Sequence, residues 1–292
     1  MKIAVTGASG FLGQHVIAEL LKRNYEVVAI IRSPKDFIYK DQCQLVKADL
    51  ASPETTDWNQ LKGISTIIHL AWDGLPNYLS LHHYEKELPR QYRFLKQLVE
   101  IGTSKLCVSG TCAEYGMRSG ALSEDTPCTP SNPYGFAKNA LREQLVYLQK
   151  ETPFQLTWAR FFYLYGKGQS ANSLYTQFQS AVENGDKTFA MSQGDQLRDF
   201  LPVEIAARHL VELALLKQDT GSVNVCAGKP TAVRTLVEEW NRSLDNPLRL
   251  KLGVYPYPSY ESIAFWGNSE KLNQLLDTSI NNFNPVKDRH LR

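Results

Sequence analysis

Tyr134 and Lys138 are the two residues whose types and spacing most directly suggest chemistry. Residues four apart on a helix lie on one face, so the phenol and the ammonium group would be neighbours. A phenol with an ordinary pKa near ~10 is a poor acid at neutral pH, and a nearby ammonium group stabilises the phenolate. Because such pairs also occur by chance on helix surfaces, their interpretation as a proton-transfer site depends on the rest of the chain.

A glycine-rich segment near the start of the chain supplies that context. Thr6 to Gly13 reads TGASGFLG and separates an apolar run, Lys2 to Thr6, from a segment with apolar residues at helical spacing, Gly13 to Arg23. This pattern predicts a strand, a turn and a helix. Without a Cβ at Gly7 or Gly10, a pyrophosphate can approach the backbone N–H groups of the helix N-terminus. We therefore predict a dinucleotide-binding turn, with an ordinary strand-to-helix turn as the alternative.

The residues after the next two strands bear on which dinucleotide is bound. Arg32 and Ser33 stand where a carboxylate would hold the ribose 2'-hydroxyl of NAD, and a guanidinium suits the 2'-phosphate of NADP. We therefore expect NADP(H) to be favoured over NAD(H), although an exposed arginine at a strand end is a simpler reading. Asp49 and Leu50 are expected to edge the adenine pocket, but Asp49 could instead cap a helix.

Composition restricts the classes of partner. The balance of 32 basic and 30 acidic residues gives no basis for nucleic-acid or membrane binding, so we expect a small-molecule substrate. Five cysteines without C-x-x-C spacing indicate reduced thiols rather than bridges. No apolar stretch is long enough to cross a bilayer and the first strand begins at Lys2, so we expect a cytoplasmic protein. The adjacent His82 and His83 cannot share a helix face; we expect them on a solvated helix surface, and expect no metal site.

Short apolar runs alternate with helix-like segments, which predicts an α/β fold with a doubly wound parallel sheet. Long helices are expected over 80–101, where Pro89 should interrupt the helix, and over 132–150; both are candidates for a homodimer interface. We expect a nucleotide-binding domain over 1–165, to which some later segments return, and a smaller mixed α/β substrate lobe over 166–292. The predicted strands are 2–6, 26–31, 44–47, 65–70, 105–109 and 155–161.

In combination, the motifs resemble those of the extended short-chain dehydrogenase/reductase family, the NAD-dependent epimerase/dehydratase group that acts on nucleotide sugars. The matching segments cover nearly the whole chain, and the resemblance implies a Rossmann fold. They are the glycine turn, the segment Ser109 to Gly116 ending in Tyr-Gly, Tyr134 to Lys138, Arg160 to Gly166, and Arg198-Asp199-Phe200.

The resemblance implies a role for each matched residue. Tyr134 would be the acid/base, Thr111 would orient the substrate carbonyl, and Lys138 would also bind the nicotinamide ribose. Arg198 would grip the nucleotide diphosphate, unless it is a surface arginine paired with Asp195 and Asp199, and Asn172 would lie near the same site. The residues expected at the cofactor are Gly7, Ser9, Gly10, Phe11, Leu12, Gly13, Arg32, Ser33, Asp49, Leu50, Leu70, Ala71, Tyr134, Lys138 and Phe161.

Departures from the family pattern narrow the reaction. Cys112 and Ala113 stand where 4,6-dehydratases of the family carry the carboxyl groups that remove water. Tyr163 stands where many members have an asparagine that contacts the diphosphate, and Gln91 where they have a buried helix asparagine. We therefore expect NADPH-dependent reduction of the 4-keto group of a dTDP- or CDP-linked 4-keto-6-deoxyhexose, giving a deoxysugar nucleotide for polysaccharide biosynthesis. The alternatives are a nucleotide-sugar 4-epimerase with tightly bound NAD, a non-catalytic NADP-binding regulator, and a reductase of small carbonyl compounds.

Overall fold

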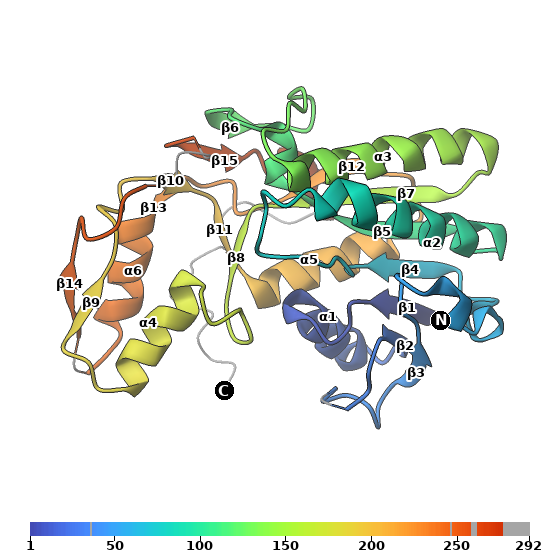
Figure 1. The fold of residues 1–292 in the computed structure, drawn as a ribbon, viewed down its shortest axis with the longest axis horizontal. Helices are drawn as coiled ribbons and strands as arrows, with labels where there is room; N and C mark the ends of the chain where they lie inside the picture. Colours follow the sequence, from blue (N-terminus) through green and yellow to red (C-terminus); the bar gives the residue numbers. More distant parts are fainter. Residues whose placement is uncertain (36, 246, 258–261, 277–292) are drawn as a thin grey trace.

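A seven-stranded, entirely parallel sheet forms the centre of the computed structural model, which describes residues 1–35, 37–245, 247–257 and 262–276 (Figure 1). The strands lie in the order β12-β7-β5-β4-β1-β2-β3, so the chain winds outwards in both directions from β1. The predicted doubly wound α/β sheet is confirmed. The strands are β1 (Lys2–Thr6), β2 (Glu26–Ile31), β3 (Gln44–Lys47), β4 (Thr66–His69), β5 (Lys105–Thr111), β7 (Gln155–Phe161) and β12 (Gly221–Val225).

Helices cover both faces of this sheet (Figure 1). Leu20 and Leu210 belong to the core on one face, and Leu98 and Leu145 to the core on the other. Because both faces are covered, the central strands read as continuous apolar runs rather than alternating ones. The first face carries α1 (Phe11–Lys22), α5 (Val203–Leu215) and α7 (Glu270–Leu276), and the second carries α2 (Leu88–Glu100) and α3 (Pro133–Glu151).

A second, smaller core lies away from the sheet. It is built around Phe178, Phe189 and Trp240, whose rings contact one another through Phe178. Its elements are α4 (Leu174–Glu183), α6 (Val233–Arg242), β9 (Thr188–Ala190) and β14 (Arg249–Lys251), at the left of Figure 1. Short strand pairs join the two units: β8 (Tyr163–Tyr165) with β11 (Phe200–Pro202), β10 (Leu197–Arg198) with β13 (Thr231–Ala232), and β6 (Gly120–Leu122) with β15 (Phe265–Gly267).

The two units do not divide the chain at one point. α5 and β12 follow the predicted boundary at 165/166 yet belong to the sheet layer, whereas α4 and α6 belong to the second unit. The boundary itself stays a prediction, and residues 277–292 of the predicted lobe lie outside the described residues.

The predicted helix over 80–101 differs from the observed one. The π-helical turn η3 (His83–Glu87) comes first, and α2 begins at Leu88 with Pro89 in its first turn, where a missing N–H costs nothing. Pro89 therefore marks a helix start. The remaining short helical turns are η1 (Pro53–Thr55), η2 (Trp58–Leu61) and η4 (Cys112–Tyr115).

Three further expectations from the sequence can be compared with the structure: the state of the cysteines, membrane-spanning helices and the histidine pair. No disulfide bond joins any of the five cysteines, Cys43, Cys107, Cys112, Cys128 and Cys226, in the described part of the chain. No helix in the described part of the chain has the length and apolar character needed to cross a membrane. The expectation of a solvated histidine pair is wrong, because His83 is fully buried and only His82 retains some exposure.

Candidate active site

A groove crosses the carboxyl ends of β1, β4 and β5, where the strand order reverses between β1 and β4. Open α/β sheets bind their ligands at such reversals. Two adjoining cavities of about 280 Å³ and about 440 Å³ form the groove, and Leu70 lines both. The smaller cavity lies at the glycine turn and the larger one at Tyr134.

The glycine turn is shaped for close approach of a ligand. Gly7 has a φ of 64°, and a Cβ there would lie 2.8 Å from the backbone nitrogen of Ala71. A Cβ at Gly13 would overlap the carbonyl oxygen of Gly7, so this glycine allows α1 to pack against β1. No side chain caps α1 at Gly10, which leaves the N–H groups of its first turn available to an anion. These features fit the pyrophosphate of a dinucleotide.

Most residues expected at the cofactor line this groove. Gly13, Ser33 and Lys138 are not among the described lining residues. Ser33 is exposed, and its hydroxyl accepts a hydrogen bond from the Lys35 N–H. Asp49 lines the cavity and also accepts the Ala51 N–H at 3.0 Å. It does not cap a helix, because the helical turn that follows, Pro53–Thr55, has Ser52 at its N-cap. The smaller cavity is lined by Gly7, Ser9, Gly10, Arg32, Asp49, Leu50, Leu70 and Ala71, and the larger by Phe11, Leu12, Leu70, Tyr134 and Phe161.

A chain of buried hydrogen bonds supports the floor of the groove. Burial lowers the pKa of His69 to about 3, so its ring is neutral. The Nε2 atom of His69 lies 2.7 Å from the Gln91 amide oxygen, and its Nδ1 lies 2.9 Å from the Thr6 hydroxyl. The Thr6 oxygen in turn accepts the N–H groups of Leu70 and Ala71. This chain fixes the end of β4 against the glycine turn.

Tyr134, Thr111 and Lys138 come together at the other end of the groove. Asn132 caps α3 by accepting the Gly135 N–H at 2.8 Å, which places Tyr134 in the first helical turn. The side chains of Tyr134 and Thr111 lie close to each other, and both residues line the larger cavity. Lys138 is only 2% exposed, and its ammonium nitrogen donates to the Ser109 carbonyl oxygen at 2.8 Å.

Burial dominates the electrostatics of this cluster. It raises the pKa of the Tyr134 phenol well above its ordinary value, with nearby Tyr78 and Glu114 adding to the rise. Burial also lowers the pKa of Lys138 to about 7. The expectation that the ammonium group brings the phenol pKa down is therefore wrong for the protein alone, because the loss of solvation outweighs it. At neutral pH Tyr134 is a proton donor.

A buried ion pair holds Thr111 in place. Glu114 and Thr111 form a capping box at η4, in which Glu114 Oε1 accepts the Thr111 N–H at 2.8 Å. The other carboxylate oxygen of Glu114 accepts from Arg160 Nε at 2.7 Å, and neither side chain is more than 2% exposed. The Trp158 indole N–H also donates to Glu114. Glu114 thus connects Thr111, at the end of β5, to two residues of the neighbouring strand β7.

Three aromatic residues that the sequence analysis did not select surround Tyr134. Trp72 donates its indole N–H to His83 Nδ1 at 3.1 Å, and its ring lies 4.1 Å from the Lys138 ammonium nitrogen. The rings of His83 and Tyr78 lie 5.3 and 5.4 Å from that of Tyr134. Trp72 follows the carboxyl end of β4, a position that could have drawn attention to it. Nothing in the local pattern indicates His83 or Tyr78.

The two residues expected at the substrate diphosphate lie differently. Arg198 is 2% exposed and donates to the carbonyl oxygens of Leu197 and Ile263, so it is not the paired surface arginine of the alternative reading. The central guanidinium carbon of Arg198 lies 4.6 Å from the centre of the Phe265 ring, and Phe265 lines the larger cavity. Asn172 is exposed and is not among the described residues that line either cavity.

The chain was compared with known proteins. A family model, the NAD dependent epimerase/dehydratase family, matches residues 3–226. The chain belongs to this family. It is 32% identical to a dTDP-6-deoxy-L-talose 4-dehydrogenase (NAD(+)) of Aggregatibacter actinomycetemcomitans over 91% of this chain and 99% of the relative. It is 24% identical to a UDP-glucose 4-epimerase of Halalkalibacterium halodurans, over 94% and 90% of the two chains.

Solved structures agree with the fold. A UDP-glucuronic acid 4-epimerase from Bacillus cereus, in complex with UDP-glucuronic acid and NAD, superposes with a TM-score of 0.80 at 23% identity, covering 96% of this chain and 94% of that one. The family resemblance and the Rossmann-like fold are confirmed, as is the prediction of an enzyme of this family. The relative and the epimerase complex are both named with NAD, so the expected preference for NADP(H) gains no support from them.

Proposed function

We propose that the protein reduces the 4-keto group of a nucleotide-linked 4-keto-6-deoxyhexose, with dTDP or CDP as the nucleotide, to a deoxysugar nucleotide. The main support is the 32% identity to a dTDP-6-deoxy-L-talose 4-dehydrogenase along 99% of that relative. Oxidation at C4 and reduction at C4 are one reaction run in opposite directions. The absence of carboxyl groups at Cys112 and Ala113 favours this chemistry over dehydration.

The cluster at Tyr134 performs the proton transfer in this proposal. A nicotinamide cofactor, when bound, supplies or accepts the hydride. Thr111 donates a hydrogen bond to the substrate oxygen, and Tyr134 gives its hydroxyl proton to the same oxygen as negative charge develops there. The high pKa that burial gives Tyr134 keeps this proton in place until the oxygen becomes basic. Lys138 holds the cofactor ribose. Its ammonium group also stabilises the phenolate that Tyr134 becomes when it has given up its proton.

The cofactor is proposed to be NADPH on the basis of Arg32. Arg32 is exposed and lines the smaller cavity at the end of β2. Its guanidinium has the forked donors that bind a phosphate. The dissociation constants of NADPH and NADH, measured by fluorescence titration, test this point. Arg32→Asp should reverse the preference; equal affinities in the wild-type protein would count against NADPH.

A nucleotide-sugar 4-epimerase with tightly bound NAD is the second candidate. It is supported by the similarity to a UDP-glucose 4-epimerase along most of both chains. An epimerase copurifies with its cofactor and consumes none, whereas a reductase consumes one equivalent per turnover. Release of cofactor by acid precipitation of the purified protein distinguishes them.

The direct test supplies dTDP-4-keto-6-deoxyglucose and NADPH and follows the loss of absorbance of the reduced cofactor. We expect substrate-dependent oxidation that falls by 10²-fold or more in Tyr134→Phe, the usual scale of general acid catalysis. Tyr147→Phe is the matched control, because Tyr147 lies on the same helix and is 64% exposed. Equal rates in Tyr134→Phe and the wild type would refute the mechanism.

The proposal also covers the binding of the substrate diphosphate, the oligomeric state and the cellular location of the protein. Arg198 is proposed to contact the diphosphate of the nucleotide sugar, and a homodimer is proposed to form through α2 and α3. The proposed role in polysaccharide biosynthesis rests on the resemblance alone, and the proposed cytoplasmic location rests on the apolar pattern of the sequence.

A further inference from the structure

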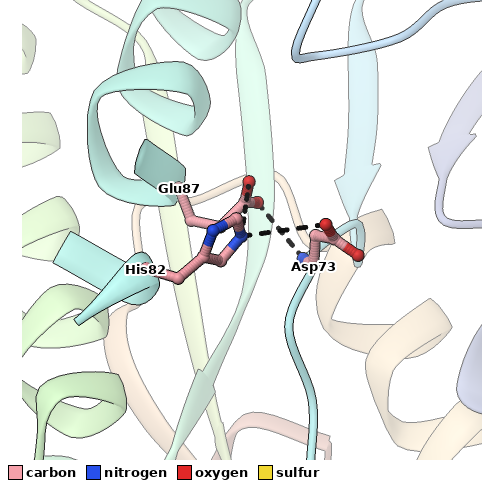
Figure 2. Close-up of side chains that lie close together, drawn as sticks. All are labelled: Asp73, His82 and Glu87. Atoms are coloured by element: carbon pink, nitrogen blue, oxygen red, sulfur yellow. Dashed lines mark hydrogen bonds and ion pairs between the residues drawn. The ribbon is translucent and has the colours of Figure 1, made fainter. Parts of the chain in front are cut away.

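Three side chains converge at the outer wall of the groove: Asp73, His82 and Glu87 (Figure 2). Asp73 lies in the loop after β4, His82 immediately precedes η3, and Glu87 ends it. His82 Nε2 lies 3.7 Å from Asp73 Oδ2 and 3.6 Å from Glu87 Oε1. This nitrogen is buried and has no hydrogen-bond partner among the described residues.

The distances in this cluster suit a shared cation better than direct hydrogen bonds. A nitrogen and an oxygen at 3.6 to 3.7 Å are too far apart for a hydrogen bond. Two ligands of a tetrahedral cation with bonds of about 2.1 Å are about 3.4 Å apart. Small side-chain rotations would therefore bring all three atoms into coordination range.

The π-helical turn explains why His82 and Glu87 meet. Its i→i+5 hydrogen bonds place residues five apart one turn from each other, whereas an α-helix would overshoot at this spacing. The ring of the neighbouring His83 packs against Trp72 and Tyr134. The sequence pattern, which predicts this pair on a solvated helix surface, does not indicate the acidic partners of His82.

Glu87 has one oxygen atom free to coordinate. Its Oε2 accepts the Asp73 N–H at 3.2 Å and the Gln91 amide at 2.9 Å. Among the described residues its Oε1 accepts one donor, Arg90 at 3.0 Å, which leaves a second lone pair for a ligand near His82. The Arg90 guanidinium compensates one carboxylate charge, and the remaining charge of Asp73 favours a cation.

From this geometry we propose that Asp73, His82 and Glu87 bind a divalent transition-metal cation of the zinc class, with water in the fourth position. One imidazole and two carboxylates suit zinc-like ions, whereas magnesium prefers oxygen ligands alone. A surface cavity lined by Asp73 and His82 gives the hydrated ion a route of entry.

The bound cation would brace one wall of the active-site groove. It would join the loop after β4 to the start of the helix that follows. This loop carries Trp72, which covers Lys138, and Leu75 and Tyr78, which line the larger cavity. Cation binding would therefore raise the melting temperature and order the loop independently of any substrate.

Equilibrium dialysis of the full-length, metal-stripped protein against Zn²⁺, followed by elemental analysis, tests the proposal. We expect the wild type to bind one equivalent more than His82→Gln, and the affinity of that site to fall by more than about 100-fold, since losing even an outer-shell partner commonly costs 10- to 100-fold. Asp73→Asn should behave alike; its side chain is 56% exposed, so this variant should fold normally. Mg²⁺ should not occupy the site.

His209→Gln is the matched control. His209 Nδ1 is also buried without a hydrogen-bond partner among the described residues, and it lies 3.7 Å from Glu212 Oε2. In the described part of the chain, however, this pair is not part of a group of three possible metal ligands. The His209→Gln variant should bind as much Zn²⁺ as the wild type. The five cysteines are unchanged in every variant, so zinc bound by thiols would not differ between them. The proposal is overturned if His82→Gln and Asp73→Asn bind as much Zn²⁺ as the wild type, or if His209→Gln loses the same equivalent.

Discussion

At the scale of single residues, removal from water controls the charge states of Tyr134 and Lys138. Lys138 makes two hydrogen bonds to Ser109 and lies over Trp72, but it makes no ion pair with a carboxylate in the described part of the chain. A charged amine in such a place loses much of its solvation and regains only part of it. Its protonation should therefore respond to pH in the neutral range.

The stability of the protein should show this response. The folded pKa of Lys138 is about 7, below the unfolded value of 10.5. Between these values the unfolded chain binds a proton that the folded chain has released, so the free energy of unfolding rises with pH. Relative to Lys138→Met, the wild type should gain up to about 1.4 kcal/mol per pH unit from pH 7 to 10.

Urea unfolding of both proteins at several pH values measures this difference. Below pH 7 the two curves should run parallel, because Lys138 is then protonated in both states. A difference that stays constant from pH 7 to 10 would show that the lysine keeps its proton in the folded protein.

Glu114 should be among the residues most important for stability. Removing it by Glu114→Ala leaves the Arg160 guanidinium buried without its carboxylate, which typically costs about 3–5 kcal/mol. Glu143→Ala is the control, because Glu143 is 47% exposed and pairs with Arg142 at the surface, where such pairs contribute at most about 1 kcal/mol. Chemical denaturation should rank the variants in this order; equal losses would contradict the account.

At the scale of elements, the glycine turn joins the fold to the cofactor. Gly7→Ala would add strain at a positive φ and place a Cβ against the Ala71 backbone. We expect dinucleotide affinity to fall at least about 10-fold, since the left-handed conformation alone costs about 1–2 kcal/mol. Gly63→Ala is the control, with a φ of 78° but open space around it. Isothermal titration should show normal affinity for that variant, and similar losses in both would contradict a specific role of the turn.

Elements with a strong local pattern could be predicted from the sequence. β1, β2, β3 and β7 have the predicted bounds. In β1 and β2 the reason is a buried apolar run that ends before Gly7 and Arg32, respectively. The helix over 80–101 could not be predicted in detail, because η3 depends on the packing of His83 and Glu87 in the interior. β5 extends two residues beyond the prediction because Gly110 and Thr111 pair with β7.

The same distinction applies to the candidate site. Residues of the glycine turn, the end of β4 and the start of α3 were found because short motifs position them. Trp72, Tyr78 and His83 were not: an irregular loop brings Trp72 and Tyr78 to Tyr134, and the π-helical turn η3 brings His83 there. Ser262 and Phe265 reach the larger cavity from far along the chain, and no local spacing indicates such a contact.

At the scale of the whole molecule, the larger cavity lies between the sheet and the strand pairs that join the second unit. Tyr163 of β8 and Phe265 of β15 line it opposite Tyr134. In the proposed function, the sheet side would supply the groups for proton transfer, and the other side would contact the remainder of the substrate. This division agrees with a ligand that has a reactive sugar and a separate nucleotide handle.

Assembly is also a property of the whole molecule. α2 and α3 lie side by side on one face of the sheet (Figure 1), and Phe136 and Tyr147 of α3 are 53% and 64% exposed. Light scattering should give twice the chain mass of 33.0 kDa. Phe136→Glu combined with Tyr147→Glu should reduce it to the monomer. A monomeric wild type at micromolar concentration would contradict the proposed dimer.

The most direct test of the central claim follows the transferred hydrogen itself. The protein is given NADPH deuterated at C4 of the nicotinamide, or NADH labelled alike, together with dTDP-4-keto-6-deoxyglucose, and the product is analysed by mass spectrometry and NMR. The account predicts one deuterium at C4 of the sugar per oxidised cofactor, and incorporation that is about 100-fold slower with Tyr134→Phe. A C4-epimerised sugar without deuterium, or product formed without cofactor oxidation, would contradict it.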